Sequence, residues 1–389
     1  MRQDIRLRER GLFMNRIDIL AYKMYSYDTD AFIRDVLNYS KNSIIVVFDF
    51  DKIIIHHKPS NIEFKKDTIY YPSKRNLYFK LLWYPIYLWQ LTKLLFAICW
   101  KYRPRICWIE NTDAAVIVGI LRRLHLCAKS IYLPGDWVAG YRNKKDILGY
   151  IFKNIIFPVH DYLACKLNDM VLDHTKEIAE ARYRFWNKEI TKKHGLYGYK
   201  PQVRSVPANS GGDKRFLCFL GDIRKDSGLD IVIFALSEVR KKYDIALKVI
   251  GPENYERYEY LKKLAAELGV AQHVDFLGFV KTDKLAEVLS DCFCGINLLT
   301  SVDSYSSYTI PGKFIHYLQF LLPVLTTKGG GPFVSQIQEK GLGIVIEPHK
   351  DKVVGAIIDI YREQNSYRGN IIQYINSQPT MSIREFVES

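Results

Sequence analysis

The stretch YTIPGKFIHYLQFLLPVLTT, Tyr308–Thr327, decides the fold of this chain, together with the run of glycines at residues 329–331. Proline suits the first turn of a helix because its missing N–H would have no partner there. The stretch therefore predicts a helix that starts at Pro311, carries Lys313 in its first turn, and leads into a short strand with a glycine loop. The free amides and the positive dipole end beside Lys313 form a site for an anion. The expected ligand is a phosphate or diphosphate.

Short apolar runs alternate with amphipathic runs on both sides of this stretch, as strands and helices do around a parallel sheet. The predicted strands are Arg16–Ala21, Ser43–Phe48, Ile53–His57, Ile106–Glu110, Ser130–Leu133, Met170–Asp173, Phe216–Leu220, Ile245–Ile250, Val274–Leu277 and Cys294–Leu298. The expected fold class is α/β, with doubly wound parallel sheets. Ligands of such sheets bind beyond the carboxyl ends of the strands.

The chain has 389 residues, more than one hydrophobic core usually serves, so two domains are expected. A segment rich in Gly, Pro and Ser, Tyr197–Lys214, separates the two halves. We expect a disordered leader at residues 1–13, a first domain at 14–200 and a second domain at 201–366.

The cysteines and the N-terminus indicate the compartment. Seven cysteines are scattered, mostly inside apolar runs, which is typical of buried thiols in a reducing compartment. The close pair Cys292 and Cys294 lacks the second pair that a zinc site needs. The first residues, MRQDIRLRERGLF, lack the apolar core of a signal peptide. We expect a cytoplasmic protein.

The positive charge lies in the first half of the chain. Residues 1–205 contain 35 Lys and Arg against 20 Asp and Glu, whereas residues 206–389 contain 21 against 22. A basic half can meet nucleic acid, an anionic membrane or a phosphorylated substrate. In the segment Arg75–Arg105 aromatic residues alternate with leucines and basic residues cluster at the ends. Three interpretations stay open: a buried helix pair broken at Pro85, the same helices with a membrane-facing side, or a membrane span.

Five blocks of the second half follow one another in the order and at the spacing of the donor-binding domain of GT-B glycosyltransferases. They are FLGDIRKDSGLD, LKVIGPE, VDFLGFVKTDKLAEVLS, GINLLTS and IPGKFIHYLQFLLPVLTTKGGG. The chain resembles these enzymes, especially those similar to family 4, over about residues 206–350. The first half resembles their acceptor domain more loosely, through ICWIENTDAAVIVGILRRLHLCAKSIYLPGDW and LNDMVLDHTKEIAE. The resemblance implies two Rossmann-like domains that face each other across a cleft, and a C-terminal helix at residues 367–389 that returns to the first domain.

The resemblance also implies which residues bind the donor. Lys313 resembles the lysine that contacts the donor diphosphate, and cationic side chains of the loop at residues 221–228 would neutralise the same group. The family places its loop cations where Asp222 and Ser227 stand here. The expected donor-binding residues are Gly221, Arg224, Lys225, Gly251, Phe279, Val280, Tyr305, Ser307, Tyr308, Thr309, Lys313 and His316.

One departure from the family concerns its Glu-x7-Glu motif. Tyr308 and His316 stand at the two acidic positions, so the pattern of retaining family 4 enzymes is not met. A neutral histidine can still exchange a hydrogen bond with a ribose hydroxyl. The Lys-x-x-His form is more similar to divergent GT-B enzymes, such as bacterial glucuronosyltransferases of exopolysaccharide synthesis, which carry Lys-x-x-Gln.

Inverting chemistry needs a base from the first domain to deprotonate the acceptor hydroxyl. The resemblance makes Asp136 the first candidate, because the family places catalytic or acceptor-binding groups at the end of the strand that corresponds to Ser130–Leu133. An Asp beside Gly is also common in turns. Glu110 and Asp113 are the reserve candidates, and Asp113 also fits a helix cap. The expected acceptor-binding residues are Tyr25, Tyr27 and Asp28.

The only two Asp-x-Asp sequences, Asp28–Asp30 and Asp49–Asp51, lie in the first half, remote from the donor blocks. We therefore expect no metal and no cofactor.

The predicted function is transfer of a hexosyl or glycuronosyl group from a UDP- or GDP-linked sugar to a glycan or lipid-linked acceptor of cell-surface polysaccharide or lipopolysaccharide. The predicted place is the cytoplasmic membrane face, on an anionic surface. The alternatives are a GT-B sugar-nucleotide epimerase, a basic nucleic-acid-binding protein, or a structural protein with a vestigial donor site. The aromatics lie in apolar runs and not on basic stacking platforms, so no nucleic-acid partner is expected.

Overall fold

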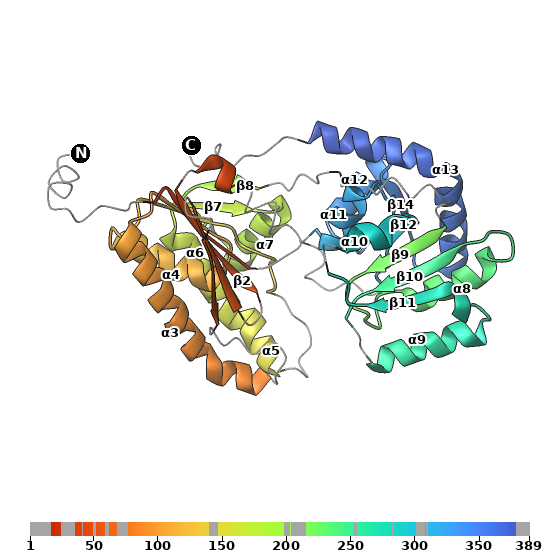
Figure 1. Ribbon diagram of the computed structural model, residues 1–389, viewed down its shortest axis with the longest axis horizontal. Coiled ribbons are helices and arrows are strands. Elements are labelled where there is room, and N and C mark those ends of the chain that lie inside the picture. The colour runs from red at the N-terminus through yellow and green to blue at the C-terminus, as the bar shows by residue number, and fades with distance from the viewer. Residues whose placement is uncertain are drawn as a thin grey trace. The chain divides into compact units, whose positions relative to one another are not determined.

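The chain folds into two compact units, residues 1–198 with 381–389 and residues 199–380. The computed structural model describes residues 17–24, 36–40, 42–49, 52–58, 62–67, 77–139, 147–197, 203, 215–252, 255–281, 284–300, 308 and 310–378. The leader expected at residues 1–13 lies outside these residues. Figure 1 shows a sheet with flanking helices in each unit.

The first unit is built on an eight-stranded sheet of order β4-β3-β2-β1-β5-β6-β7-β8. The strands are β1 (Ile19–Met24), β2 (Ser43–Asp49), β3 (Lys52–Lys58), β4 (Ile62–Asp67), β5 (Ile106–Ile109), β6 (Lys129–Tyr132), β7 (Met170–Asp173) and β8 (His194–Leu196). Six of them, from β2 to β8 along the sheet, are parallel. The sheet is mixed because β3 and β4 add antiparallel to its edge. This corrects the expectation of a wholly parallel sheet: β3 follows β2 after a short turn, and so tight a connection can join only antiparallel strands.

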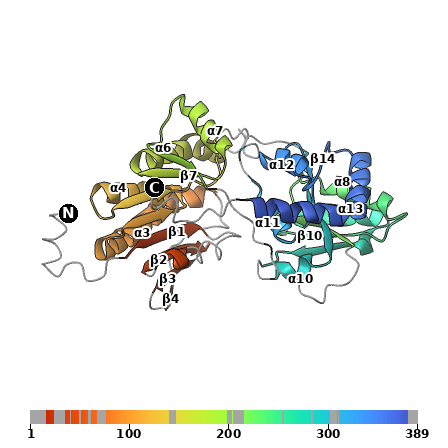
Figure 2. The same ribbon diagram turned by 90° about the horizontal axis from the view of Figure 1, so that it is seen from above.

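Three helices cover one face of this sheet: α3 (Leu77–Tyr102), α4 (Thr112–Arg123) and α6 (Phe157–Leu167). Helix α6 continues α5 (Ile147–Ile151) through the π-helical turn η1 (Phe152–Ile156), and α7 (Lys176–Trp186) follows β7. Figure 2 shows the helical layer from a second direction. Helix α3 is continuous through Pro85, which corrects the predicted break. Pro85 lies on the exposed side, where water can hydrate the carbonyl that lacks its amide partner.

The second unit is built on a six-stranded parallel sheet of order β11-β10-β9-β12-β13-β14. The strands are β9 (Phe216–Leu220), β10 (Ala246–Ile250), β11 (Val274–Gly278), β12 (Cys292–Asn297), β13 (Val324–Thr327) and β14 (Gly343–Ile346). The helices are α8 (Leu229–Val239), α9 (Tyr255–Glu267), η2 (Ala271–His273), α10 (Leu285–Leu289), α11 (Gly312–Gln319), α12 (Phe333–Glu339) and α13 (Lys350–Ser377). The predicted helix is confirmed, with Pro311 as its N-cap and Gly312 as its first residue, and the predicted parallel sheet is confirmed as well.

Helix α13 differs from the expectation for the C-terminus. It runs from Lys350 to Ser377 with one non-helical residue, Glu363, where it changes direction, and Figure 1 shows the bend. Ile371 and Ile375 are buried in the core cluster of the second unit. Residues 367–377 therefore belong to the second unit, because two fully buried isoleucines hold them there.

Candidate functional site

The sheet of the second unit reverses its strand order between β9 and β12. In open α/β sheets a ligand binds beyond the carboxyl ends of the strands at such a switch point. Strands β9 and β12 are parallel neighbours, and their carboxyl ends lead into Gly221 and Leu298. The residues after these two strands therefore define where a ligand of this unit would bind.

Helix α11 is fixed to this switch point by Tyr317. The hydroxyl of Tyr317 accepts from the amide of Leu220 at 3.0 Å and donates to the carbonyl of Ile296 at 2.9 Å, so it bridges β9 and β12. Gly295 makes room for the ring, since a Cβ there would lie 2.3 Å from Cγ of Tyr317. Lys313 precedes Tyr317 by four residues, so the two side chains share one face of the helix. The buried tyrosine thereby positions the lysine.

The amino group of Lys313 lies at the end of β9. A Cβ built on Gly221 would lie 3.6 Å from Nζ of Lys313, and Nζ also lies 4.6 Å from the centre of the Phe219 ring. Burial, and to a smaller extent the nearby Arg224 guanidinium, lower the pKa of Lys313 to about 8, against opposing effects of Asp222 and Asp226. Within the described part of the chain, no carboxylate forms an ion pair with Lys313. A half-buried ammonium beside a second cation attracts an anion.

The loop at residues 221–228 carries that second cation. The side chain of Arg224 is half exposed, and its Nε lies 3.0 Å from Oδ1 of Asp226. The Ser227 hydroxyl donates to the carbonyl of Arg224 at 2.7 Å, and the Thr300 amide donates to the carbonyl of Asp226 at 3.0 Å. Lys225 is exposed in the same loop. Hydrogen bonds therefore shape the loop while the Arg224 guanidinium keeps donors for a ligand.

Three glycines bring the ends of β9, β10 and β11 close together. The amide of Gly221 donates to Ile250 and that of Gly251 to Gly278, each at 2.9 Å. A Cβ on Gly251 would lie 1.9 Å from the carbonyl oxygen of Gly221, so only glycine fits. Gly221 itself has φ 121°, which a side chain would strain. The backbone can therefore approach a ligand closely here.

The other predicted donor residues are placed only in part. Phe279 follows β11 and is 75% exposed, and Val280 is half-buried against a core cluster. Tyr308 and His316 are both half-buried, with His316 one turn along α11 from Lys313. Tyr305, Ser307 and Thr309 lie outside the described residues. The structure thus brings Lys313, Gly221, Arg224 and Gly251 together, and it places Phe279 and Val280 at the end of the neighbouring edge strand.

In the first unit, the reserve candidate Glu110 is held by a buried lysine. Lys23 on β1 lies 2.7 and 2.6 Å from the two carboxylate oxygens of Glu110, which follows β5. Lys23 is fully buried. Strands β1 and β5 are neighbours at the switch point of this sheet. An ammonium on both oxygens opposes protonation of the carboxylate, so Glu110 is poorly suited to act as a base.

Asp136 lies in the loop that follows β6, and its side chain is exposed. The next residue, Trp137, is buried and packs edge to face against Phe157 and Phe185. The Arg182 guanidinium lies 5.8 Å from its ring centre. Arg182 itself is buried and bonded to Asp161 and Asp173. The buried Trp137 therefore holds the backbone next to Asp136.

Asp113 has a different role from the cap that the sequence allowed. Asn111 caps α4, because its side chain accepts from the amide of Ala114. The carboxylate of Asp113 accepts from the Tyr84 hydroxyl at 2.6 Å and lies 2.9 Å from Nδ1 of His160. It therefore joins helices α3, α4 and α6.

The acceptor residues Tyr25, Tyr27 and Asp28 lie outside the described residues. Among the residues that are described, no group of three or more His, Cys, Asp or Glu side chains is placed to hold a metal ion. The seven cysteines are free and buried. No described helix is long and apolar enough to cross a membrane.

Sequence reasoning missed several residues that shape the site, notably Tyr317, Gly295, Asp226 and Lys23. The four-residue spacing from Lys313 could have identified Tyr317. Asp226 could have been found from its place two residues after Arg224, with which it forms an ion pair. Nothing local marks Gly295 or Lys23, because their partners lie far away in sequence; Lys23 and Glu110 are 87 residues apart.

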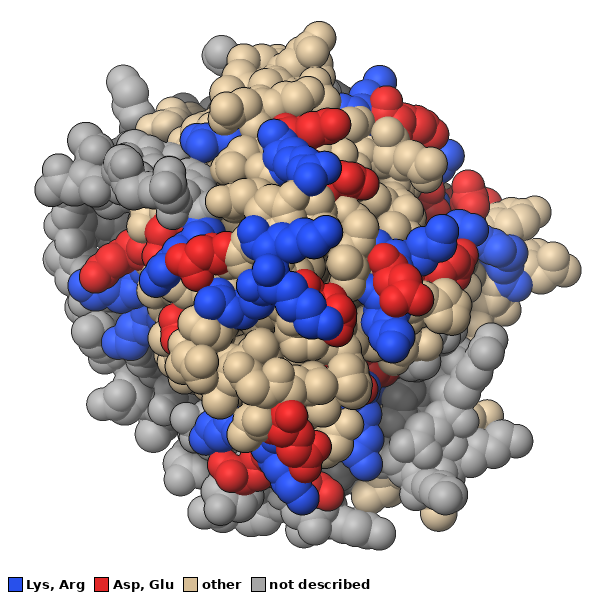
Figure 3. Space-filling view, turned by 90° about the vertical axis from the view of Figure 1, so that its right-hand side faces the viewer, with Lys and Arg blue, Asp and Glu red and all other residues tan. Residues whose placement is uncertain are grey.

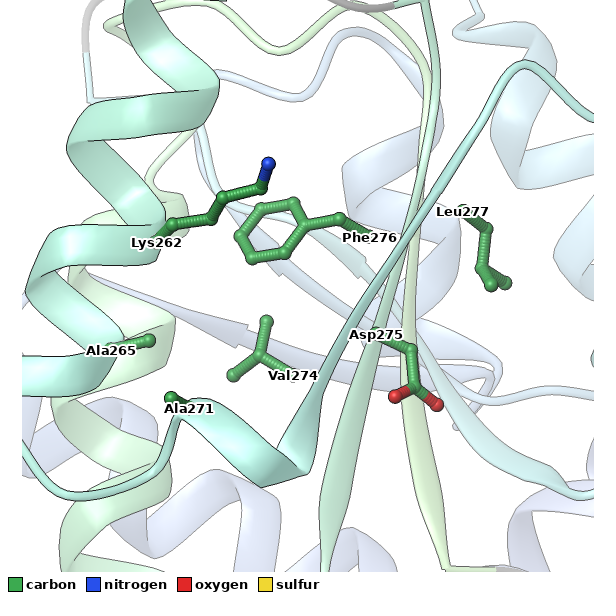
Figure 4. Close-up of a pocket in the computed structure, with 7 residues that line it drawn as sticks. All are labelled: Lys262, Ala265, Ala271, Val274, Asp275, Phe276 and Leu277. Atoms are coloured by element: carbon green, nitrogen blue, oxygen red, sulfur yellow. The ribbon is translucent and has the colours of Figure 1, made fainter.

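A pocket of about 420 Å³ in the second unit lies apart from these strand ends, along the flank of the edge strand β11. Figure 4 shows Lys262 and Phe276 on the side of α9, with Asp275 and Leu277 pointing the other way. Its walls are mainly apolar, with Lys262 and Asp275 as the charged members. It lacks the set of cations and free amides that a diphosphate needs.

Comparison with known proteins gives a family and a fold. The profile of the family described as "Glycosyl transferases group 1" matches residues 183–378. A curated relative is the GDP-mannose-dependent alpha-(1-6)-phosphatidylinositol monomannoside mannosyltransferase of Mycobacterium tuberculosis strain H37Rv, 28% identical over 156 residues. That alignment covers 38% of this chain and 39% of the relative, so the chain matches about two fifths of that protein's length.

Three solved structures share the fold over nearly the whole chain. Sucrose-phosphate synthase from Thermosynechococcus elongatus has a TM-score of 0.64 at 13% identity, covering 95% of this chain and 96% of its own. HepE from Anabaena, in complex with UDP and glucose, has a TM-score of 0.62 at 14% identity, and the match covers 96% of this chain and 99% of HepE. WaaG, a glycosyltransferase involved in lipopolysaccharide biosynthesis, has a TM-score of 0.59 at 14% identity, and the match covers 95% of this chain and 98% of WaaG.

Proposed function

Because the chain belongs to the group 1 glycosyl transferases, whose profile covers half of it, we propose that it transfers a sugar from a nucleotide-sugar donor to a glycan or lipid-linked acceptor. We propose that the second unit binds the donor and that the first unit binds the acceptor. The donor is proposed to be a UDP- or GDP-linked hexose or hexuronic acid, and the product a cell-surface polysaccharide or glycolipid.

One observation carries the donor part of this proposal. The Lys313 ammonium is half-buried against Gly221 at the switch point, beside Arg224, and has no carboxylate partner among the described residues. Two neighbouring cations raise the free energy of the empty site, and a bound diphosphate would relieve the repulsion. The glycine-lined strand ends would let the chain's backbone lie against the same group.

The proposed chemistry follows from these groups. When the bond between the anomeric carbon and the diphosphate breaks, negative charge grows on the leaving diphosphate. Lys313 and Arg224 would stabilise that charge. In an inverting reaction, Asp136 would take the proton from the acceptor hydroxyl that attacks the anomeric carbon. His316 would exchange a hydrogen bond with the donor ribose.

The relatives support a lipid-linked acceptor. The mycobacterial protein is named for a phosphatidylinositol mannoside acceptor, and WaaG is described as acting in lipopolysaccharide biosynthesis. We propose a similar acceptor here, met at an anionic membrane surface by the basic first half of the chain.

Thermal-shift measurements against a panel of nucleoside diphosphates and nucleotide sugars test the donor proposal. A nucleoside diphosphate at 100 times its Kd should stabilise the protein by about 2.7 kcal/mol, because it binds the folded state alone. The matching nucleoside monophosphate serves as the control, since it lacks the second phosphate. If no member of the panel raises the melting temperature, the donor site does not exist.

Asp136→Asn tests the proposed base. We expect kcat to fall about 10²- to 10⁴-fold with donor binding unchanged, because the amide cannot accept the acceptor proton. Asp351→Asn, an exposed aspartate in the first turn of α13, is the matched control. Transfer rates within a factor of two of each other in Asp136→Asn and the control would show that Asp136 is not the base.

A further inference from the structure

We propose that the outward side of helices α3 and α5–α6 in the first unit is a surface that docks on an anionic lipid bilayer. This inference rests on the lipid-linked acceptor proposed above and identifies the surface that would reach it. Helix α3 and helix α6 both bury their inward sides in one core cluster on the same face of the sheet. Their exposed sides therefore look outward from the same side of the unit.

An unusual row of apolar side chains follows the outer side of the helix formed by α5, η1 and α6. Its members recur every four residues and are between 38% and 66% exposed: Ile147, Ile151, Ile155, Val159 and Leu163. A step of four residues advances about 40° around an α-helix, so a long row would wind away. The wider π-helical turn, Phe152–Ile156, lies in the middle of the row and offsets part of this drift. The row therefore stays on the outer side.

Helix α3 adds aromatic side chains to the same side. Trp89 and Trp100 are 63% and 60% exposed, and Ile86 and Phe96 are exposed between and beside them. The amine of Lys93 lies 5.2 Å from the Trp89 ring centre, and the Arg103 guanidinium 5.1 Å from that of Trp100. Tryptophan with a cation at its rim is suited to the depth of lipid headgroups.

The charges on these helices select the partner. The helical segments α3, α4 and α5–α6 carry the cations Lys93, Lys101, Arg122, Arg123, Lys153 and Lys166, of which Arg122 is paired with Asp169 at 3.0 Å. Their only acidic residues are Asp113 and Asp161. Asp161 is fully buried against Arg182, and Asp113 is turned toward Tyr84 and His160. No acidic side chain on these segments is thus left to repel an anionic surface.

The second unit presents a different surface. The view in Figure 3, from the side that this unit occupies in Figure 1, shows Lys and Arg interspersed with Asp and Glu. Helix α9, for example, pairs Lys262 with Glu259 and Lys263 with Glu267. Mixed charges of this kind gain little from an anionic bilayer, whereas exposed apolar residues flanked by cations gain both hydrophobic and Coulomb energy.

The three helices are also joined into one rigid support. Tyr84 of α3 and His160 of α6 both contact the same oxygen of Asp113 on α4, at 2.6 and 2.9 Å. A second contact, 3.2 Å, joins Tyr84 to His160 directly. A surface whose helices are fixed to one another loses little conformational entropy on docking.

Flotation with vesicles tests this surface. The full chain is mixed with vesicles of phosphatidylcholine alone, or of an equimolar mixture of phosphatidylcholine and phosphatidylglycerol. We expect binding to the mixed vesicles at low salt, and at least a tenfold weaker affinity for the double variant Ile155→Asp with Val159→Asp. Ile372→Asp with Phe234→Asp is the matched control, because both residues are on helices of the second unit and are exposed to similar extents, 42% and 41%. The control should bind as wild type does.

Each other outcome overturns the inference. Wild-type protein that ignores mixed vesicles, or a double variant that binds them as well as the control, means that this surface does not dock on lipid. Sedimentation without vesicles tests whether a second copy of the chain covers this surface instead of lipid. A wild-type dimer that the double variant converts into a monomer would show that it does. Nucleoside diphosphate binding, measured on the same samples, separates failure of this inference from failure of the proposed donor site.

Discussion

Lys313→Met is expected to lower kcat/KM about 10²- to 10³-fold, because the charge that stabilises the departing diphosphate is lost while the apolar stem of the side chain is kept. Nucleoside diphosphates should no longer raise the melting temperature. Steady-state transfer rates and thermal shift measure the two effects. Lys350→Met is the matched control, since Lys350 is an exposed lysine at the start of another helix of the same unit. Unchanged nucleotide binding in Lys313→Met would remove the lysine from the site.

The same variant has a second expected effect, on stability. The pKa of Lys313 in the folded protein is about 8, below its ordinary value of 10.5. Below pH 8 the Lys313 amine is charged in both the folded and the unfolded protein. The folded protein then bears the full free-energy cost of burying that charge. Between pH 8 and 10.5 the unfolded state binds more protons, so the free energy of unfolding rises with pH. Without its ligand, Lys313→Met should therefore be more stable than wild type at pH 7, by about 2 kcal/mol after allowance for the half-exposure of the amine.

Denaturant unfolding at pH 7 and at pH 10.5 measures this effect. The difference between Lys313→Met and wild type should shrink as the pH rises, since the wild-type amine then loses its proton. A variant that is less stable than wild type at pH 7 would show that the amine is already compensated in the empty site. The kcat/KM of the wild type should fall above pH 8 for the same reason, whereas Lys313→Arg should keep its activity there.

Gly251→Ala is expected to destabilise the protein by about 3 kcal/mol and to abolish nucleotide binding. The added Cβ would lie 1.9 Å from the carbonyl oxygen of Gly221, and backbone cannot move aside as a flexible side chain can. The ends of β9 and β10 would separate, and Gly221 would shift away from Lys313. Denaturant unfolding and thermal shift with the preferred nucleotide measure the two effects.

Gly369→Ala is the control for the glycine exchange. Gly369 lies in α13 on the exposed side, with no atom within 4 Å of an added Cβ, so alanine should stabilise the helix by up to about 1 kcal/mol. If Gly251→Ala were as stable as Gly369→Ala and still bound nucleotide, the close approach of the two strand ends would not be needed for the site.

Local patterns predicted much of the second unit. Strand Phe216–Leu220 and strand Met170–Asp173 of the first unit have the predicted bounds, because an apolar run between turn residues permits little else. The helix after Pro311 begins where the proline and the free amides required. Lys313 and Gly221 could be predicted as site residues because they stand next to the predicted ends of a helix and a strand.

Contacts between distant residues could not be predicted in this way. Pro85 predicted a break, but the packing of α3 on the sheet retains the helix on both sides of it. Residues 367–389 were expected to return to the first unit; burial of Ile371 and Ile375 instead holds residues 367–377 in the second unit, whereas residues 381–389 are grouped with the first.

The sequence by itself determined two α/β sheets with parallel central strands and a lysine at a helix start beside glycine-ended strands, because periodicity and backbone preference act over a few residues. Tertiary structure alone decided how those parts meet. Tyr317 bridges β9 and β12 so that Lys313 lies against Gly221, and Lys23 binds both oxygens of Glu110. Such contacts join residues up to 97 positions apart, and they depend on burial and charge balance that no local stretch contains.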